Sequence, residues 1–255
     1  MNSVVTERRS PRTHINPARS ATASASAARP SLNPEFSVTR NGYHVRLVPD
    51  HGRLRDDIER LITDRYASRG LRTDKPIEPH APTGEVTLAA CRGDRVFGTL
   101  TVRNDIGRGI FADARYRNEI DTVRARGAAV CEVGRLAMET AYGGQEALAT
   151  LFQVGFIVAR YAWSRSDCFI EVHPRHAAFY NHMLGYRPAG PETTCPRVGA
   201  PAVLMHLPLD EAERFAVLRG QSCAAEHAAR NLYRQFLPPH FQSAIVADLL
   251  EYGRL

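Results

Sequence analysis

Apolar and polar residues alternate along several short segments of the chain, which is the pattern of half-buried β-strands. The first such segment covers residues 44–48. Residues 86–91 and 96–102 follow as a pair, and the Gly93-Asp94 step between them is typical of a hairpin turn. Further strands are predicted at residues 129–137, 168–173 and 202–207.

Helical periodicity marks the segments between these strands. Residues 54–67 predict an amphipathic helix, and residues 145–165, apolar on most sides, predict a buried one. A short helix is expected from Pro174 to Leu184, because proline suits the first helical position and Gly185 follows where a C-terminal cap belongs. Residues 68–84 read as a Gly- and Pro-containing loop, and weaker helical patterns cover 111–126 and, broken at Pro238-Pro239, 209–255.

The order of these elements predicts one fold class. A hairpin followed by strand–helix units indicates a mixed sheet with helices on both faces, an α/β (α+β mixed sheet) fold. Ligands of such sheets bind where parallel strands diverge at their C-terminal ends, here at residues 132–137 and 171–173. We expect residues 1–40, rich in Ala, Ser, Arg and Pro, to be a disordered basic leader. Residues 41–208 would form the folded domain and 209–255 a helical C-terminal extension.

The charge of the chain is concentrated outside the predicted domain. The formal net charge is +6, and residues 1–40 hold six Arg and two Glu, which amounts to +4. The rest of the chain shows no face on which basic and aromatic residues interleave, so a nucleic-acid partner is not expected. No apolar run reaches membrane-spanning length, so no transmembrane segment is expected either. The five cysteines form no C-x-x-C pair, which predicts no metal site and reduced thiols in a cytoplasmic protein.

Four short segments are similar to one enzyme superfamily. Residues 178–186 resemble the penultimate helix and turn of GNAT acyltransferases, and residues 131–137 (CEVGRLA) resemble the Glu-x-x-Arg strand of acyl-homoserine-lactone synthases. Residues 172–176 (VHPRH) and 195–204 (CPRVGAPAVL) look like segments of the FeeM-like N-acyl amino acid synthases, which are relatives of those enzymes. The resemblance covers about residues 43–208 and implies a GNAT acyltransferase fold.

The resemblance also implies a reaction. A fatty acyl group would move from the phosphopantetheine thioester of an acyl carrier protein to the α-amine of an amino acid, with no permanently bound cofactor. Acetyl-CoA-dependent GNAT enzymes carry a longer glycine-rich phosphate loop than residues 141–145 (AYGGQ) provide. The shorter loop suits one phosphodiester, and its helix N-terminus still offers N–H groups to a phosphate; acyl-CoA stays the alternative donor. The expected donor-binding residues are Leu136, Ala137, Met138, Gly143, Gly144 and Gln145.

Acyl transfer to an amine needs a base, donors for the oxyanion and a proton source for the leaving thiolate. Glu132 is the candidate base, because desolvation in an apolar strand raises the pKa of a carboxyl; the alternative is a buried ion pair with an arginine. Tyr180 matches the tyrosine that the family places near the leaving sulfur, and the alternative is a packed core residue. His173 is a candidate proton relay or substrate ligand, with the capping of a local turn as the alternative.

Two arginines are candidates for binding the acceptor. Arg135 would hold the acceptor's carboxylate, with a structural ion pair as the alternative, and strand alternation puts its side chain on the face opposite to Glu132. Arg197 is the second candidate; together with Arg175 and Arg187 it would also suit contact with an acidic carrier protein, against a simple solvated surface.

Two other functions stay open at this point. One is an acetyl-CoA-dependent GNAT N-acetyltransferase, against which the short phosphate loop argues. The other is a catalytically inactive GNAT-fold binding module, against which the presence of both Glu132 and Tyr180 argues.

Overall fold

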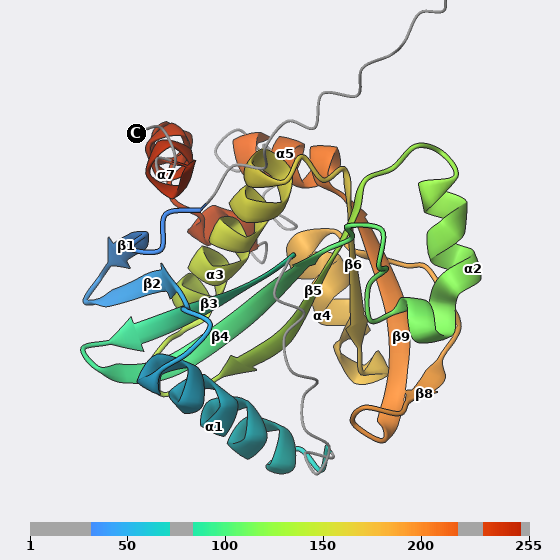
Figure 1. Ribbon diagram of the computed structural model, residues 1–255, viewed down its shortest axis with the longest axis horizontal. Helices are drawn as coiled ribbons and strands as arrows, with labels where there is room; N and C mark the ends of the chain where they lie inside the picture. The colour runs from blue at the N-terminus through green and yellow to red at the C-terminus, as the bar shows by residue number, and fades with distance from the viewer. Residues whose placement is uncertain (1–31, 72–83, 219–231, 251–255) are drawn as a thin grey trace, which may run out of the picture.

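The computed structural model describes residues 32–71, 84–218 and 232–250 (Figure 1). Its strands form one sheet in the order β1-β2-β3-β4-β5-β6-β9-β7, with β8 paired to β9. The strands are β1 Ser37–Arg40, β2 Tyr43–Leu47, β3 Glu85–Arg92, β4 Arg95–Asn104, β5 Val130–Met138, β6 Asp167–Val172, β7 Arg187–Pro188, β8 Thr193–Cys195 and β9 Ala200–Pro208.

Helices fill the connections between the strands. They are α1 Arg53–Ala67, α2 Asp113–Arg124, α3 Gln145–Ile157 with the π-helical turn η1 Val158–Ala162, α4 Pro174–Leu184, α5 Leu209–Leu218, the 3-10 helix η2 Leu232–Gln235 and α7 Pro239–Leu250. The prediction of a mixed α/β fold is confirmed. Within the described residues, helix covers parts of the predicted C-terminal extension on both sides of the Pro238-Pro239 break.

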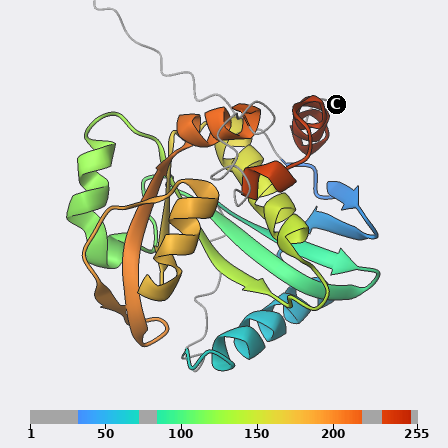
Figure 2. The same ribbon diagram turned by 180° about the vertical axis from the view of Figure 1, so that it is seen from behind.

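The two faces of the sheet carry different helices (Figures 1 and 2). On one face α1 packs Ile58 and Ile62 against Ala137, and α2 packs Tyr116 against Phe169. On the other face lie α3, α4 and the C-terminal helices, which share the largest buried cluster with the sheet. The amphipathic spacing of α1 thus matches a helix that covers the sheet with one side exposed. The nearly continuous apolar sequence of α3 matches a helix buried between the sheet and other elements.

The two central strands, β5 and β6, separate part-way along their length. They pair in parallel from Val130–Asp167 to Val133–Ile170, whereas β5 continues to Met138 along β4. The remaining strand pairs among the described residues are antiparallel. One edge of β5 is therefore left without a strand partner beyond Val133, as expected for a ligand site at diverging strand ends.

A bulge follows in β5 at the same place. Thr101 pairs with Gly134 and Thr99 with Ala137, so two residues of β5 lie opposite one residue of β4. Arg135, one of these two, has a φ of 52°, in the left-handed region that a non-glycine residue rarely adopts.

Residues before 41, the start that we predicted for the folded domain, belong to the sheet and its core. Phe36 is 1% exposed, β1 pairs with β2, and the Asn33 N–H donates to the Leu249 carbonyl at 2.9 Å. The short apolar alternation at residues 36–38 was hidden by the polar composition before it, and residues 1–31 lie outside the described part of the chain.

Other differences are smaller. The short strands β7 and β8 were not predicted, and the helix expected over 145–165 ends in a π-helical turn at Ala162. In the described residues, no helix is long and apolar enough to cross a membrane.

Candidate active site

Glu132 is a buried carboxylate one residue before the point where β5 and β6 separate. The residue is only 4% exposed, and its Oε2 accepts a hydrogen bond of 2.6 Å from the Phe111 N–H. Burial is the largest influence and raises the pKa of Glu132 to about 7, against the lowering effect of Arg197. A carboxylate with such a pKa takes up and releases a proton near neutral pH, which suits a general base.

The aromatic ring of Phe111 lies between two guanidinium groups. Arg103, the β4 partner of Glu132, stands 3.6 Å from the ring centroid, and Arg197, from the turn between β8 and β9, stands 4.5 Å from it. Arg103 also forms an ion pair of 2.6 Å with Glu85. These cation–π contacts hold Phe111, and with it the N–H that binds Glu132.

Glu171 is a second buried carboxylate on the same face, and its side chain is 4% exposed. Its Oε2 forms ion pairs with Arg115 of α2 and, at 3.0 Å, with Arg197. Arg197 thus lies near both carboxylates, while its own side chain stays 43% exposed; its predicted role in binding the acceptor stays a prediction.

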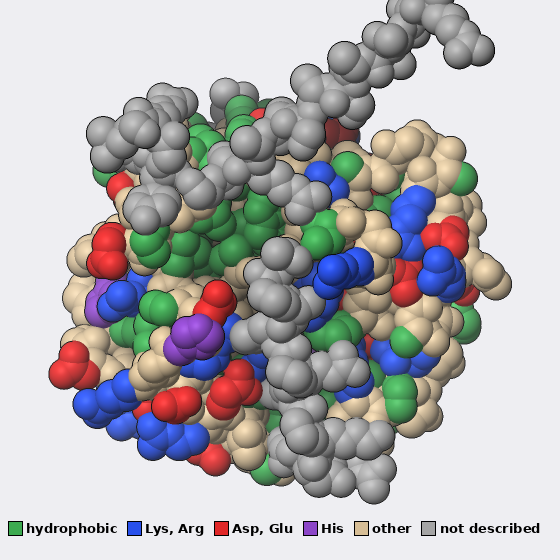
Figure 3. Space-filling view, viewed as in Figure 1, with side chains coloured by type: hydrophobic (Ala, Val, Ile, Leu, Met, Phe, Trp, Pro, Cys, Tyr) green, Lys and Arg blue, Asp and Glu red, His purple; other side chains and the backbone are tan. Residues whose placement is uncertain are grey.

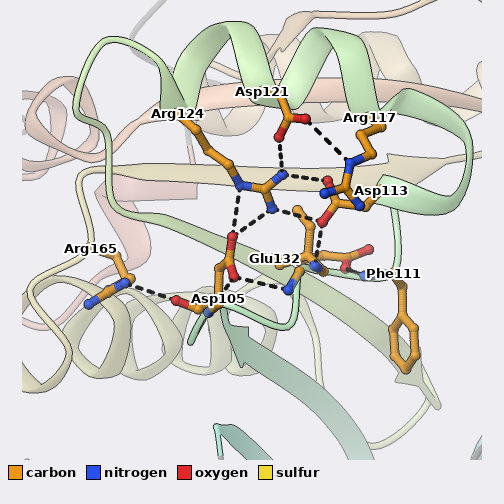
Figure 4. Close-up of polar contacts among 11 residues, drawn as sticks. Asp105, Phe111, Asp113, Arg117, Asp121, Arg124, Glu132 and Arg165 are labelled. Carbon is orange, nitrogen blue, oxygen red and sulfur yellow. Dashed lines mark hydrogen bonds and ion pairs between the residues drawn. The ribbon is translucent and has the colours of Figure 1, made fainter.

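A network of carboxylates around Arg124 holds the loop that carries Phe111 (Figure 4). The Arg124 guanidinium donates to Asp105 at 2.8 Å and to Asp113 at 2.6 Å, so it ties the end of α2 to both sides of this loop. Figure 4 shows Glu132 beneath this network with Phe111 beside it. The charged stretch 104–127, to which we could assign no role from sequence, therefore positions a hydrogen-bond donor on Glu132.

Arg135, a candidate for binding the acceptor's carboxylate, is paired within the protein. Its side chain is 9% exposed and forms an ion pair with Glu59 of α1. Because α1 covers the same face as α2, the prediction that Arg135 and Glu132 face opposite sides is wrong, and the bulge in β5 is the reason. The ion pair with Glu59 corresponds to the structural alternative.

Tyr180 lies across the sheet from Glu132, on the α4 side of the strand separation. Its ring packs against Phe152, Phe179 and Tyr186 with centroid distances of 5.4 to 6.3 Å. Burial raises the pKa of its hydroxyl, so the group keeps its proton at neutral pH. Among the described residues, no hydrogen-bond partner is found for this hydroxyl, which leaves it available as a donor.

His173 is the N-cap of α4. Its Nδ1 accepts a hydrogen bond of 3.2 Å from the Arg175 N–H. This is the capping arrangement that was the alternative to a proton relay, and it commits one of the two ring nitrogens to the helix.

The predicted donor-binding residues lie along the open part of β5 and the start of α3. Leu136 is half-buried there, whereas Ala137 and Met138 are buried. Gly144 is the N-cap of α3 without a side-chain cap. A Cβ at Gly143 would lie 2.2 Å from the Phe97 ring, so only glycine fits this turn.

The first turn of α3 already carries a negative charge. Glu146 forms an ion pair of 3.1 Å with Arg40 and accepts hydrogen bonds from Asn41. This carboxylate occupies a helix N-terminus, a position that favours negative charge.

An apolar cavity of about 30 Å³ lies on the α3 side of the sheet. It starts at Val133, the last β5 residue paired with β6, and Phe152 and Cys168 form part of its wall. Ala212 of α5 and Phe236 beside η2 complete it, so the C-terminal extension contributes to its lining.

Charged residues of opposite sign alternate on the surface over α1 and α2 (Figure 3). They form local ion pairs such as Arg60–Asp57 and Arg117–Asp121.

Sequence reasoning missed four residues of the site: Arg103, Phe111, Arg115 and Glu171. The only available signal was that Arg103 and Glu171 are charged residues within otherwise apolar strands, which is rare without a partner. The part played by Phe111 is a backbone contact, which leaves no mark in the side-chain pattern.

The fold is that of the GNAT acyltransferases. The structure is similar to that of FeeM, an N-acyl amino acid synthase from uncultured soil microbes: the TM-score is 0.61 at 24% identity, over 72% of this chain and 97% of that one. A ribosomal-protein-S5-alanine acetyltransferase from Vibrio fischeri is similar at a TM-score of 0.46 and 14% identity, over 69% and 98% of the two chains.

The model of the family described as N-acyl amino acid synthase FeeM matches residues 57–208, which is more than half of the chain. The chain therefore belongs to this family of N-acyltransferases. A comparison with curated proteins gives no match.

Proposed function

We propose that this enzyme transfers a fatty acyl group from the phosphopantetheine thioester of an acyl carrier protein to the α-amine of an amino acid. The observation that carries the proposal is the buried carboxylate of Glu132, with a pKa near 7, at the separation of β5 and β6 in a chain of this family. Acyl transfer to an ammonium group requires such a base beside the place where the thioester lies.

In the proposed reaction the acceptor binds on the face that carries Glu132. Glu132 takes a proton from the acceptor's ammonium group, and the freed amine attacks the thioester carbonyl. The C–N bond forms, the C–S bond breaks, and the thiolate takes the proton of Tyr180. The nitrogen then loses its second proton, which restores the Tyr180 hydroxyl by way of solvent, and Glu132 releases its own proton to solvent. N–H groups along the open edge of β5, at residues 136–138, would stabilise the oxyanion.

Two features support a carrier-protein donor over a CoA thioester. The loop before α3 is short, and its tight turn at Gly143 leaves no room for side-chain ligands. The paired Glu146 in the first turn of α3 adds a negative charge that opposes a second phosphate. A single phosphodiester, as in phosphopantetheine, suits this helix end.

We extend the proposal to a cytoplasmic enzyme, because reduced thiols such as the buried Cys168 persist in the cytoplasm.

The apolar cavity supports a fatty acyl group over an acetyl group. The cavity is lined by Val133, next to the strand separation, and by aliphatic and aromatic side chains of α3 and the elements around it. An alkyl chain gains about 0.8 kcal/mol for each buried methylene, so even a partial fit favours long chains over acetyl. Its small size implies that neighbouring side chains move apart when a chain enters.

The test is product analysis with the purified protein. Three donors, a long-chain acyl carrier protein, the matching acyl-CoA and acetyl-CoA, are each incubated with a mixture of amino acids, and the products are identified by mass spectrometry. We expect N-acyl amino acids from the carrier protein, less from acyl-CoA and none from acetyl-CoA. Acetylated products alone would show that the donor assignment is wrong, and no product from any donor would reject the proposed function.

A matched pair of variants assigns the product to the site. Glu132→Gln removes the proposed base and should abolish product formation. Asp167→Asn removes a largely buried carboxylate at the far end of β6, and product should still form. Equal product from Glu132→Gln and from the unaltered enzyme would contradict the role of Glu132.

A further inference from the structure

Glu171 has a free carboxylate oxygen where β5 and β6 separate. Ile170 is the last β6 residue that pairs with β5, and Glu171 follows it. Its side chain is 4% exposed, and Oε2 makes both of its ion pairs, to Arg115 and Arg197. Oε1 is buried and has no hydrogen-bond partner among the described residues. Because an unsatisfied buried acceptor costs about 1–3 kcal/mol, this oxygen indicates a ligand that donates a hydrogen bond.

Glu171 and the proposed base Glu132 lie on the same face of the sheet, close enough for their charges to interact. The parallel register pairs Glu132 with Phe169, and side chains two residues apart on a strand share a face. The charge of Glu171 is one of the influences that raise the pKa of Glu132, although burial is the largest. Arg197 acts on both carboxylates, through an ion pair with one and its nearby charge on the other.

Glu171 and Arg197 place one charge of each sign close to Glu132. They pair at 3.0 Å, and the Arg197 side chain is 43% exposed, so a ligand can reach its guanidinium from solvent. A zwitterion brings one charge of each sign to this pair, which avoids an uncompensated buried charge.

We propose that Oε1 of Glu171 binds the ammonium group of the acceptor amino acid, while Arg197 holds its carboxylate. This inference rests on the proposed function. Glu171 orients the ammonium group, and Glu132 beside it removes the proton. Amines that lack a carboxylate, and carboxylic acids that lack an amine, fill only half of the site.

The experiment measures binding without turnover, by calorimetry on the full chain. The ligands are L-tyrosine and 3-(4-hydroxyphenyl)propanoate, which lacks only the ammonium group, with L-leucine and 4-methylpentanoate as a second pair. A hydrogen bond to a charged group is worth about 1.5–3 kcal/mol, so Glu171→Gln should weaken binding of the amino acid roughly 10- to 150-fold. The same change should leave the affinity for the acid that lacks the ammonium group within about 2-fold.

Asp167→Asn is the matched control for a buried carboxylate on the same strand and face. Asp167 lies at the other end of β6, 2.7 Å from the His206 Nε2, and its substitution should leave both affinities unchanged. Equal weakening of both ligands by Glu171→Gln would show a structural role and overturn the proposal. Failure of the unaltered chain to bind either amino acid would also overturn it, and product analysis with the three donors tells this apart from a failure of the acyl transfer.

Discussion

Replacing Glu132 with glutamine is expected to stabilise the protein at alkaline pH while it removes the proposed base. Burial raises the pKa of Glu132 from 4.5 to about 7 in the folded protein. The native state therefore favours the protonated carboxyl, and its stability is full below the unfolded value and falls as the pH rises through 7. Glutamine has no proton to lose, and its carbonyl oxygen still accepts the Phe111 N–H.

The size of the effect follows from the shift. Each pKa unit corresponds to about 1.4 kcal/mol, so a shift of roughly 2.5 units makes the ionisation of Glu132 cost about 3 kcal/mol of folding free energy. Because Glu132 is only 4% exposed, solvent screening removes little of this. The measurement is urea unfolding of the unaltered protein and of Glu132→Gln at pH 5 and at pH 8.

The informative quantity is the change in the stability difference between the two pH values. Effects of the substitution that do not depend on pH cancel in it. We expect the variant to gain about 2.5 kcal/mol relative to the unaltered protein between pH 5 and pH 8. A gain below about 0.5 kcal/mol would show that the pKa of Glu132 is not raised and would contradict its proposed role as a base near neutral pH.

Three further predictions concern the elements that hold the site. Arg124→Met leaves mostly buried aspartates without their cation and should lower the free energy of unfolding by about 3–5 kcal/mol, measured by thermal unfolding. Arg117, on the same helix, is 72% exposed, so Arg117→Met should change it by no more than about 0.5 kcal/mol. Equal effects of the two substitutions would show that the network around Arg124 does not hold the loop. Gly143→Ala meets the Phe97 ring and should cost about 1–3 kcal/mol and raise KM for the donor but not for the acceptor, as steady-state kinetics would show. Gln153→Leu removes two hydrogen bonds to the backbone after η2, of 2.7 and 3.1 Å, and should cost about 2–4 kcal/mol and expose the C-terminal segment to limited proteolysis; an unchanged digestion pattern would contradict this.

The elements with strong local patterns could be predicted from the sequence. The hairpin around Gly93-Asp94 and the capped helix from Pro174 to Gly185 carry turn and cap residues that leave few alternatives. The strand β1 escaped because its four residues follow a polar, low-complexity stretch, and a short alternation of that kind is not distinctive.

The site could be predicted only in part, because its arrangement depends on contacts between distant segments. Glu132 stood out as a charge in an apolar strand, and Arg197 reaches it through the turn between β8 and β9. The bulge that turns Arg135 toward α1 could not be read from alternation, since a bulge breaks the period on which alternation depends. Glu171 gains its significance from an oxygen left without a partner, which only three-dimensional packing decides.

The most direct test of the account is the pH dependence of kcat/KM for N-acyl amino acid formation, measured for the unaltered enzyme and for Glu132→Gln. If Glu132 is the base, kcat/KM rises with pH and levels off above about 7, and the variant loses roughly 100- to 10,000-fold without this rise. A variant that keeps activity within about 10-fold, with the same rise near neutral pH, would show that another group takes the proton.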